Sequence, residues 1–189
     1  ALQDLQHPNL VALYELGQID EQLYFTMELI DGQHLLAYVR PDDPHAASIA
    51  ISSTMTGGAV DELTADLAVA TPGGRRAAVE APPEIGGEVG YDEARLRAVL
   101  PQLLLALSAL HGGHKIHRDL KPSNVLVTAA GRVVVLDFGV ISDAGFDELA
   151  GEGTVVGTAA YMAPEQVAAQ RVGPEADVYS VGVVLYQAL

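Results

Sequence analysis

The sequence predicts an α+β fold in which short strands precede and interrupt a helical body. Two apolar runs separated by a polar turn lie within residues 10–29, and two further short runs lie within residues 125–136. A long helical pattern covers residues 92–111, and a second apolar helix is expected over residues 178–189. The 189 residues are 49% hydrophobic, which is enough to build the core of one domain.

The first two strands are predicted over residues 10–16 and 22–29, because both runs are rich in apolar and aromatic residues. The intervening residues 17–21 combine a glycine with polar side chains and predict a hairpin turn. Asp31 and Gly32 are expected to end the second strand.

Residues 41–90 differ from the rest of the chain in composition. They contain five prolines, three Gly-Gly pairs, many small residues and scattered acids, and their apolar spacing is weak. Such a segment buries too little apolar surface to fold tightly. We expect a mostly disordered or loosely ordered insertion, with at most a short helix near residues 60–69.

The central helix is predicted to begin after Asp92, a favourable N-cap, and to end near residue 111. Leucine and valine recur within it at steps of three and four residues, which predicts a strongly apolar face. Pro101 lies inside this pattern and should remove one backbone hydrogen bond and kink the helix. Two short strands, residues 125–128 and 132–136, are expected to follow.

Composition and charge exclude several classes of function. The formal net charge is −15, from 25 acidic and 10 basic side chains, so a general basic surface for nucleic acid is not expected. The absence of cysteine excludes disulfides and thiolate metal sites. No apolar run reaches the roughly 18 residues of a membrane-spanning helix, and the first residues do not resemble a signal peptide. We therefore expect a cytoplasmic domain without a nucleic-acid partner or a membrane segment.

The densest chemical feature is the segment from His117 to Asn124. It places an acid, Asp119, a cation, Lys121, and the amide of Asn124 on one predicted loop, and Asp137 follows the next strand. Carboxylate and amide oxygens that converge from neighbouring loops form a hard, oxygen-rich site, which suits Mg²⁺. The two loops therefore predict a magnesium site whose remaining ligands are water and phosphate.

These motifs resemble those of the protein kinase family. Residues 117–124 fit the H-R-D-x-K-x-x-N catalytic loop, residues 137–139 fit the D-F-G loop, and residues 163–165 fit the A-P-E motif. Residues 177–182 resemble the start of the family's buried central helix. The lysine two positions after Asp119 resembles the Ser/Thr-specific form of the catalytic loop.

The resemblance covers almost the whole chain except residues 41–90. It implies a protein-kinase-like fold that consists mostly of the helical C-lobe, over residues 31–189, with the last N-lobe strands and the hinge in residues 1–30. The family's glycine-rich loop and strand lysine are not found, and the first residue is not Met. We therefore expect a fragment of a eukaryotic-like bacterial Ser/Thr kinase that is truncated within its central helix.

The resemblance also implies the roles of individual residues. Asp119 is expected to accept the proton of the substrate hydroxyl, and Lys121 to neutralise charge on the transferring phosphoryl group. Asn124 and Asp137 are expected to hold magnesium. Arg118, next to the catalytic acid, is expected to pair with a phosphate on the activation loop.

Two threonines are expected to act in regulation and substrate choice. Thr154 is the expected site of an activating phosphate, and Thr158 is expected to contact Asp119 and Lys121 and to favour Ser/Thr substrates. Four residues are expected to form the stacked apolar spine of the active state: Leu2, Leu13, His117 and Phe138.

The adenine site is expected at the hinge. Met27 resembles the gatekeeper, and the backbone carbonyl of Glu28 and the backbone N–H of Ile30 are expected to read the adenine edge. Leu126 resembles the floor of the adenine pocket, and His34 stands where the family often has a polar residue near the ribose.

The expected function is transfer of the γ-phosphate of ATP to Ser or Thr hydroxyls of protein substrates, with ATP and Mg²⁺ as cofactors. A pseudokinase or scaffold is the main alternative, and the retained Asp119, Lys121, Asn124 and Asp137 argue against it. A small-molecule kinase is a second alternative, against which the motif at residues 163–165 argues. The 189 residues alone are expected to be inactive.

Overall fold

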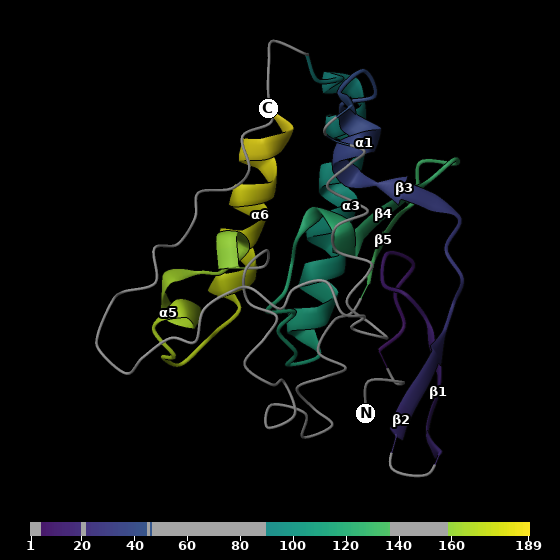
Figure 1. The fold of residues 1–189 in the computed structure, drawn as a ribbon, viewed down its shortest axis with the longest axis vertical. Coiled ribbons are helices and arrows are strands. Elements are labelled where there is room, and N and C mark those ends of the chain that lie inside the picture. Colours follow the sequence, from purple (N-terminus) through teal and green to yellow (C-terminus); the bar gives the residue numbers. More distant parts are fainter. Residues whose placement is uncertain (1–4, 20–21, 45, 47–89, 137–158) are drawn as a thin grey trace, which may run out of the picture.

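The computed structural model describes residues 5–19, 22–44, 46, 90–136 and 159–189. Its strands are β1 (Leu13–Ile19), β2 (Gln22–Met27), β3 (Gly32–His34), β4 (Val125–Thr128) and β5 (Val133–Val135). Its helices are α1 (Leu35–Val39), α3 (Glu93–Gly112), α5 (Pro164–Val167) and α6 (Glu175–Ala188), with 3-10 turns η2 (Pro122–Asn124) and η4 (Ala159–Tyr161). This mixture of helices and antiparallel strands confirms the predicted α+β class (Figure 1).

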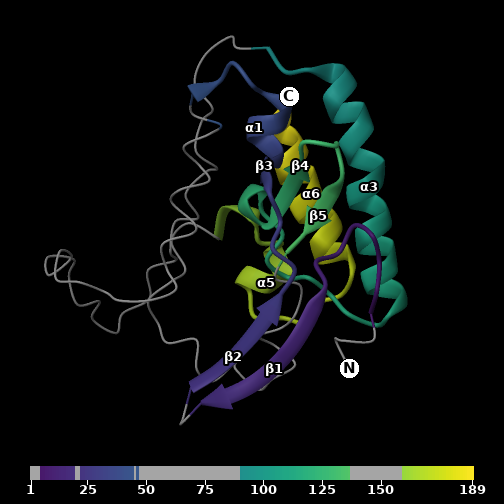
Figure 2. The same cartoon turned by 90° about the vertical axis from the view of Figure 1, so that its right-hand side faces the viewer.

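The predicted hairpin is present as the antiparallel pair β1–β2, which lies at one end of the helical body in both ribbon views (Figures 1 and 2). The predicted turn was too long, because β1 continues to Ile19, which pairs with Gln22. The predicted first strand also began too early. Leu10 instead forms a parallel bridge with Val135, so this stretch joins the hairpin to the second sheet.

The second sheet has the order β3-β4-β5 and is antiparallel throughout. Strand β4 has the predicted bounds, whereas β3 was missed because Gly32 reads as a turn residue. Here Gly32 permits a close approach between strands, since a Cβ atom at this position would lie 2.9 Å from the carbonyl oxygen of Val127. The sheet therefore depends on a contact between residues that are far apart in the sequence.

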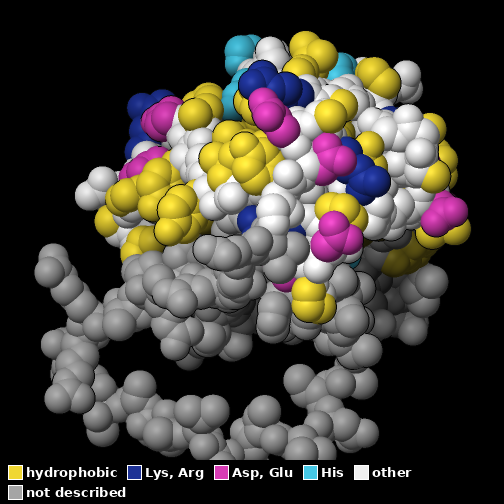
Figure 3. All heavy atoms as spheres, turned by 90° about the horizontal axis from the view of Figure 1, so that it is seen from above, with side chains coloured by type: hydrophobic (Ala, Val, Ile, Leu, Met, Phe, Trp, Pro, Cys, Tyr) yellow, Lys and Arg dark blue, Asp and Glu magenta, His cyan; other side chains and the backbone are white. Residues whose placement is uncertain are grey.

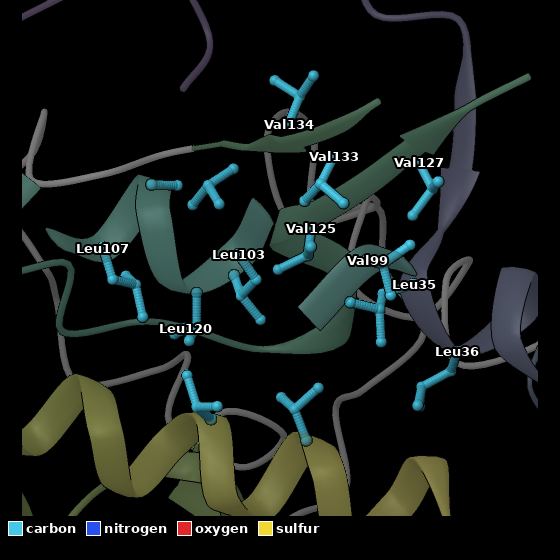
Figure 4. Packing of buried hydrophobic residues seen from close by; sticks show 14 of the residues in the cluster. Leu35, Leu36, Val99, Leu103, Leu107, Leu120, Val125, Val127, Val133 and Val134 are labelled. Atoms are coloured by element: carbon cyan, nitrogen blue, oxygen red, sulfur yellow. The ribbon is translucent and has the colours of Figure 1, made fainter. Parts of the chain in front are cut away.

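The core lies between α3, this sheet and α6. Helix α3 begins as predicted, with the Asp92 carboxylate accepting a hydrogen bond from the backbone N–H of Arg95 at 2.9 Å, and it continues as one helix past Pro101. Figure 4 shows Leu103, Leu120 and Val125 between α3, the strands and α6. Each of these side chains is fully or almost fully buried. This packing fixes the loop that links α3 to β4.

The chain on the two sides of residues 47–89 is held together. The backbone N–H of Asp92 donates to the carbonyl of Val39 at 2.8 Å, and Arg95 donates to the carbonyl of Tyr38 at 2.9 Å. Arg40 and Asp43 form a buried ion pair at 3.1 Å. The described end of the molecule seen in Figure 3 carries basic and acidic side chains interspersed with apolar ones. The predicted insertion began too early, because Asp43 and Ala46 are buried, and its predicted disorder otherwise falls on residues 47–89, outside the described part.

Within the described residues, no helix has both the length and the apolar character needed to cross a membrane.

Helix α6 begins at Glu175, three residues earlier than predicted, and so includes Asp177 in its first turn. This difference is important for the site, because Asp177 is completely buried.

Candidate active site

The three predicted catalytic residues lie together on the loop between α3 and β4. Lys121 Nζ lies 2.9 Å from Asp119 Oδ2, and Asn124 Nδ2 donates to the same carboxylate oxygen at 3.2 Å and to the Asp119 carbonyl at 2.8 Å. The 3-10 turn η2, with Pro122 at its start, brings Asn124 back towards Asp119. Local chain geometry therefore assembles the cluster.

The two oxygens of Asp119 differ in their surroundings. Oδ2 is held by Lys121 and Asn124, whereas Oδ1 is buried and has no hydrogen-bond partner among the described residues. The side chain as a whole is 41% exposed. A buried carboxylate oxygen without a donor is costly, so Oδ1 is the atom in this cluster best suited to accept a proton from an incoming hydroxyl.

Asn124 has one atom left for a cation. Its amide nitrogen donates to Asp119, which leaves the hard oxygen Oδ1 as the ligand that Mg²⁺ prefers. The backbone carbonyl of Asn124 accepts from the N–H of Leu136 at 2.8 Å, so the last described residue before Asp137 lies beside Asn124. The residue types at this position therefore fit magnesium, although the described residues contain no group of three or more His, Cys, Asp or Glu side chains that could hold a metal alone.

A buried carboxylate holds the backbone of the catalytic loop. Asp177, on α6, accepts hydrogen bonds from the backbone N–H groups of His117 and Arg118, each at 2.9 Å, and its Oδ2 lies 2.7 Å from His111 Nε2. Arg118 has φ of 66°, a left-handed conformation that is unfavourable for a residue with a side chain. The negative charge of Asp177 is further stabilised by the N-terminus of α6.

Sequence reasoning assigned no role to the side chains of Asp177 and His111. Their partners lie 59 to 66 positions away in the sequence. The available signal was an acid in the first turn of an otherwise apolar helix. Such an acid is either a helix-end charge or a buried acceptor, and only the fold distinguishes the two.

His117 fits the packing role expected for it. It is 3% exposed, its Nδ1 accepts from the backbone N–H of Asp119 at 3.3 Å, and its Nε2 lies 2.8 Å from the carbonyl of Leu136. Since Nδ1 acts as the acceptor, Nε2 carries the proton and donates to Leu136. The ring therefore ties the catalytic loop to the strand that leads into residue 137.

The predicted hinge residues follow β2. Glu28 donates its backbone N–H to the carbonyl of Ala12 at 2.8 Å, and its carboxylate is bound by Arg132 at 2.9 and 3.0 Å. Met27 is the last residue of β2, and Ile30 is partly buried against the core. The structure thus places residues 28–30, the predicted hinge, between β2 of the first sheet and β3 of the second.

Leu126, the predicted adenine floor, lies on β4 directly opposite His34 on β3. His34 Nδ1 and the hydroxyl of Ser123 are buried without a hydrogen-bond partner among the described residues. Burial lowers the pKa of His34, and the backbone of Pro122 and Ser123 offsets part of this effect. The imidazole is therefore held towards its neutral form.

The segment after residue 158 docks on the catalytic loop. Gln166 donates to the carbonyl of Arg118 at 2.7 Å, and its side-chain oxygen accepts from the backbone N–H of Ala163 at 3.1 Å. The side chain of Arg118 is exposed, as a phosphate-binding role would require. The other predicted site residues fall outside the described part of the chain: Leu2, Asp137, Phe138, Thr154 and Thr158.

Comparison with known proteins also indicates a protein kinase. The protein kinase domain family matches residues 82–189. The probable serine/threonine-protein kinase PknB of Lactococcus lactis is 27% identical over 189 residues, which is all of this chain and 23% of that protein. Serine/threonine-protein kinase PknE of Mycobacterium tuberculosis is 31% identical over 185 residues, 98% of this chain and 25% of that protein.

Serine/threonine-protein kinase PknL of Mycobacterium tuberculosis is 42% identical over 92 residues, 49% of this chain and 23% of that protein. The chain therefore spans about a quarter of the length of the curated relatives it matches. The family match covers more than half of the chain and includes the cluster at Asp119. On this basis, the chain belongs to the protein kinase family.

Proposed function

We propose that this chain supplies the catalytic loop of a kinase that transfers the γ-phosphate of ATP to Ser or Thr hydroxyls of protein substrates. The observation that carries the proposal is the cluster of Asp119, Lys121 and Asn124, in which one carboxylate oxygen is held and the other receives no hydrogen bond from the described residues. The relatives named as serine/threonine-protein kinases support the same substrate class.

In the proposed mechanism, Asp119 Oδ1 accepts the proton of the substrate hydroxyl and orients the oxygen for attack. Lys121, held at 2.9 Å from Asp119, offers positive charge where charge builds up on the transferring group. Asn124 and Asp137 would hold magnesium, which neutralises phosphate charge when bound. Positioning supplies most of the rate enhancement, so Asp177 contributes by holding the strained backbone of Arg118, which directly precedes Asp119.

The activation segment supports a protein substrate. Residues 163–166 dock directly on the catalytic loop, because Gln166 donates to the carbonyl of Arg118. Since Arg118 directly precedes Asp119, a movement of this segment would shift the position of Asp119. In the same proposal, Thr154 carries an activating phosphate that Arg118 binds, and Thr158 contacts the catalytic loop. We also propose that the domain lies in the cytoplasm, where ATP is available.

The experiment is a transfer assay with radiolabelled ATP on the full-length protein, with a generic Ser/Thr substrate. Asp119→Asn keeps the size of the side chain but removes the proton acceptor, and we expect the rate to fall by about 10²–10⁴-fold. Binding of ATP should be retained in this variant. Undiminished transfer by the variant would contradict the role of Asp119, and ATP binding without any transfer by the wild type would favour a pseudokinase. The 189-residue chain alone is expected to be inactive in the same assay.

A further inference from the structure

Arg132 joins three parts of the chain that are distant in sequence. Its Nη2 donates to both carboxylate oxygens of Glu28, at 2.9 and 3.0 Å, and its Nε donates to the carbonyl of Pro8 at 2.9 Å. Arg132 follows the turn after β4, Glu28 follows β2, and Pro8 precedes β1. One guanidinium therefore connects the second sheet to both ends of the hairpin.

The backbone of Arg132 is itself held by hydrogen bonds. The backbone N–H of Arg132 donates to Thr128 Oγ1 at 3.2 Å, and its carbonyl accepts from the N–H of Thr128 at 2.9 Å. Gly131 adopts φ of 77°, which glycine accepts without strain, and its carbonyl accepts from Gln102 on α3 at 2.8 Å. A side chain that starts from a fixed turn loses less conformational entropy when it forms an ion pair.

The ion pair is also partly shielded from water. The side chain of Arg132 is 39% exposed and that of Glu28 is 27% exposed. A partly buried guanidinium with several acceptors is more effective than an exposed surface pair, because its charge is less screened and the planar group fixes the geometry. The pair is thus suited to hold Glu28 in one orientation.

Glu28 is restrained on two sides. Its side chain is bound by Arg132, and its backbone N–H is bound by the carbonyl of Ala12 at 2.8 Å. Together these bonds fix the side chain of Glu28 and the peptide that precedes its Cα atom, and so restrict the adjoining peptide, which carries the Glu28 carbonyl, the group proposed to accept a hydrogen bond from adenine. The next residue, Leu29, is 96% exposed and contributes little packing of its own. The two bonds to Glu28 are therefore the restraints nearest to this carbonyl among the described residues.

We propose that Arg132 is a positioning residue for nucleotide binding, which acts by clamping Glu28 so that the hinge carbonyl is presented to adenine in one orientation. The proposal rests on the proposed function, because it assumes that ATP binds at this hinge. It differs from a purely structural role in that loss of the clamp should weaken ATP binding and leave the chemical step nearly unchanged.

The first experiment is a double-mutant cycle in the full-length protein, with Glu28→Gln, Arg132→Gln and both changes together. We expect each single change to raise KM for ATP by about fivefold, with kcat and KM for the protein substrate nearly unchanged. The double variant should show no further rise, because both changes remove the same interaction. Arg132→Lys, which keeps the charge but lacks the planar fork, should give a smaller rise in KM than Arg132→Gln.

The matched control is Arg97→Gln. Arg97 pairs with Glu93 on the surface of α3, at 2.7 Å, and the two side chains are 78% and 62% exposed. This change removes an arginine from an ion pair distant from the hinge, and KM for ATP should remain at the wild-type value. An equal rise in KM for ATP with Arg97→Gln would overturn the proposal, as would additive effects of Glu28→Gln and Arg132→Gln.

The second experiment is independent of catalysis. Amide hydrogen exchange without nucleotide should be faster at the Glu28 amide in Arg132→Gln than in the wild type, by about the same fivefold factor. Unchanged exchange would overturn the clamp whatever the kinetics show. If the wild type transfers no phosphate but exchange at Glu28 responds as expected, the clamp stands and the proposed function fails.

Discussion

Replacement of Asp177 by alanine is the sharpest test of how the fold supports the catalytic loop. The carboxylate is 0% exposed and accepts from the backbone N–H groups of His117 and Arg118, each at 2.9 Å, and from His111 at 2.7 Å. Its removal leaves two buried backbone donors without acceptors, at about 1–3 kcal/mol each. It also releases Arg118 from its left-handed conformation. We expect the free energy of unfolding to fall by about 3–5 kcal/mol.

Activity should fall by more than stability alone explains. Arg118 directly precedes Asp119, so relaxation of its backbone moves the proposed base, and a loss of about 1.4 kcal/mol in positioning lowers kcat tenfold. We therefore expect kcat to fall at least tenfold at a temperature where the variant remains folded. Pulse proteolysis in urea on the full-length protein measures stability, and initial rates of phosphate transfer measure kcat.

The matched control for this prediction is Glu175→Ala. Glu175 is an exposed acid in the same first turn of α6, so its loss removes only a favourable helix-end charge, about 0.3–1 kcal/mol. If Asp177→Ala costs no more than Glu175→Ala, or if it unfolds the protein no earlier and leaves kcat unchanged, then Asp177 does not hold the loop.

Three further predictions concern the second sheet and the insertion. Gly32→Ala should destabilise the protein by about 1–3 kcal/mol, because the new Cβ atom would lie 2.9 Å from the carbonyl oxygen of Val127. Gly112→Ala is the control and should be neutral or stabilising, because its Cβ atom would have nothing within 4 Å. Equal urea midpoints for the two variants would contradict this prediction. Burial lowers the pKa of His34 below 6.5, so its contribution to stability is present above that pH and lost as the pH falls through the folded-state pKa. His34→Gln should therefore show a smaller loss of stability between pH 7.5 and about pH 5 in urea titrations, and an unchanged pH profile would refute this. Replacement of residues 47–89 by a short Gly-Ser linker should leave the protein folded and up to about 2 kcal/mol more stable, because the hydrogen bond between Asp92 and Val39 already holds the two ends of the segment together. Loss of cooperative unfolding in this variant would show that the segment is part of the core.

The features that sequence reasoning predicted well are those with local causes. Helix α3 begins where Asp92 caps it, and β4 has its predicted bounds, because capping and apolar alternation are read from a few neighbouring residues. Asp119, Lys121 and Asn124 were expected together and lie together, since Asp119 and Asn124 are only five positions apart and one 3-10 turn lies between them. Their catalytic roles stay predictions.

The features that it missed depend on distant partners. Strand β3 forms because Gly32 can lie against Val127, and nothing within residues 31–34 shows that this neighbour exists. The role of Asp177 likewise depends on loop amides 59 and 60 positions away. A local pattern gives the residue type that a turn or helix end prefers, but burial and pairing are properties of the folded chain.

Asp177 and Arg132 illustrate one physical strategy on two sides of the candidate site. Each is a charged side chain that binds groups on a neighbouring segment of the candidate site. Asp177 holds the backbone that precedes the proposed base, and Arg132 holds the side chain whose backbone is the proposed adenine acceptor. Because a charge-assisted hydrogen bond has a well-defined length and direction, it transmits the rigidity of the core to loops that must remain open to ligands. The two devices predict different kinetic signatures: loss of Asp177 should lower kcat, and loss of Arg132 should raise KM for ATP.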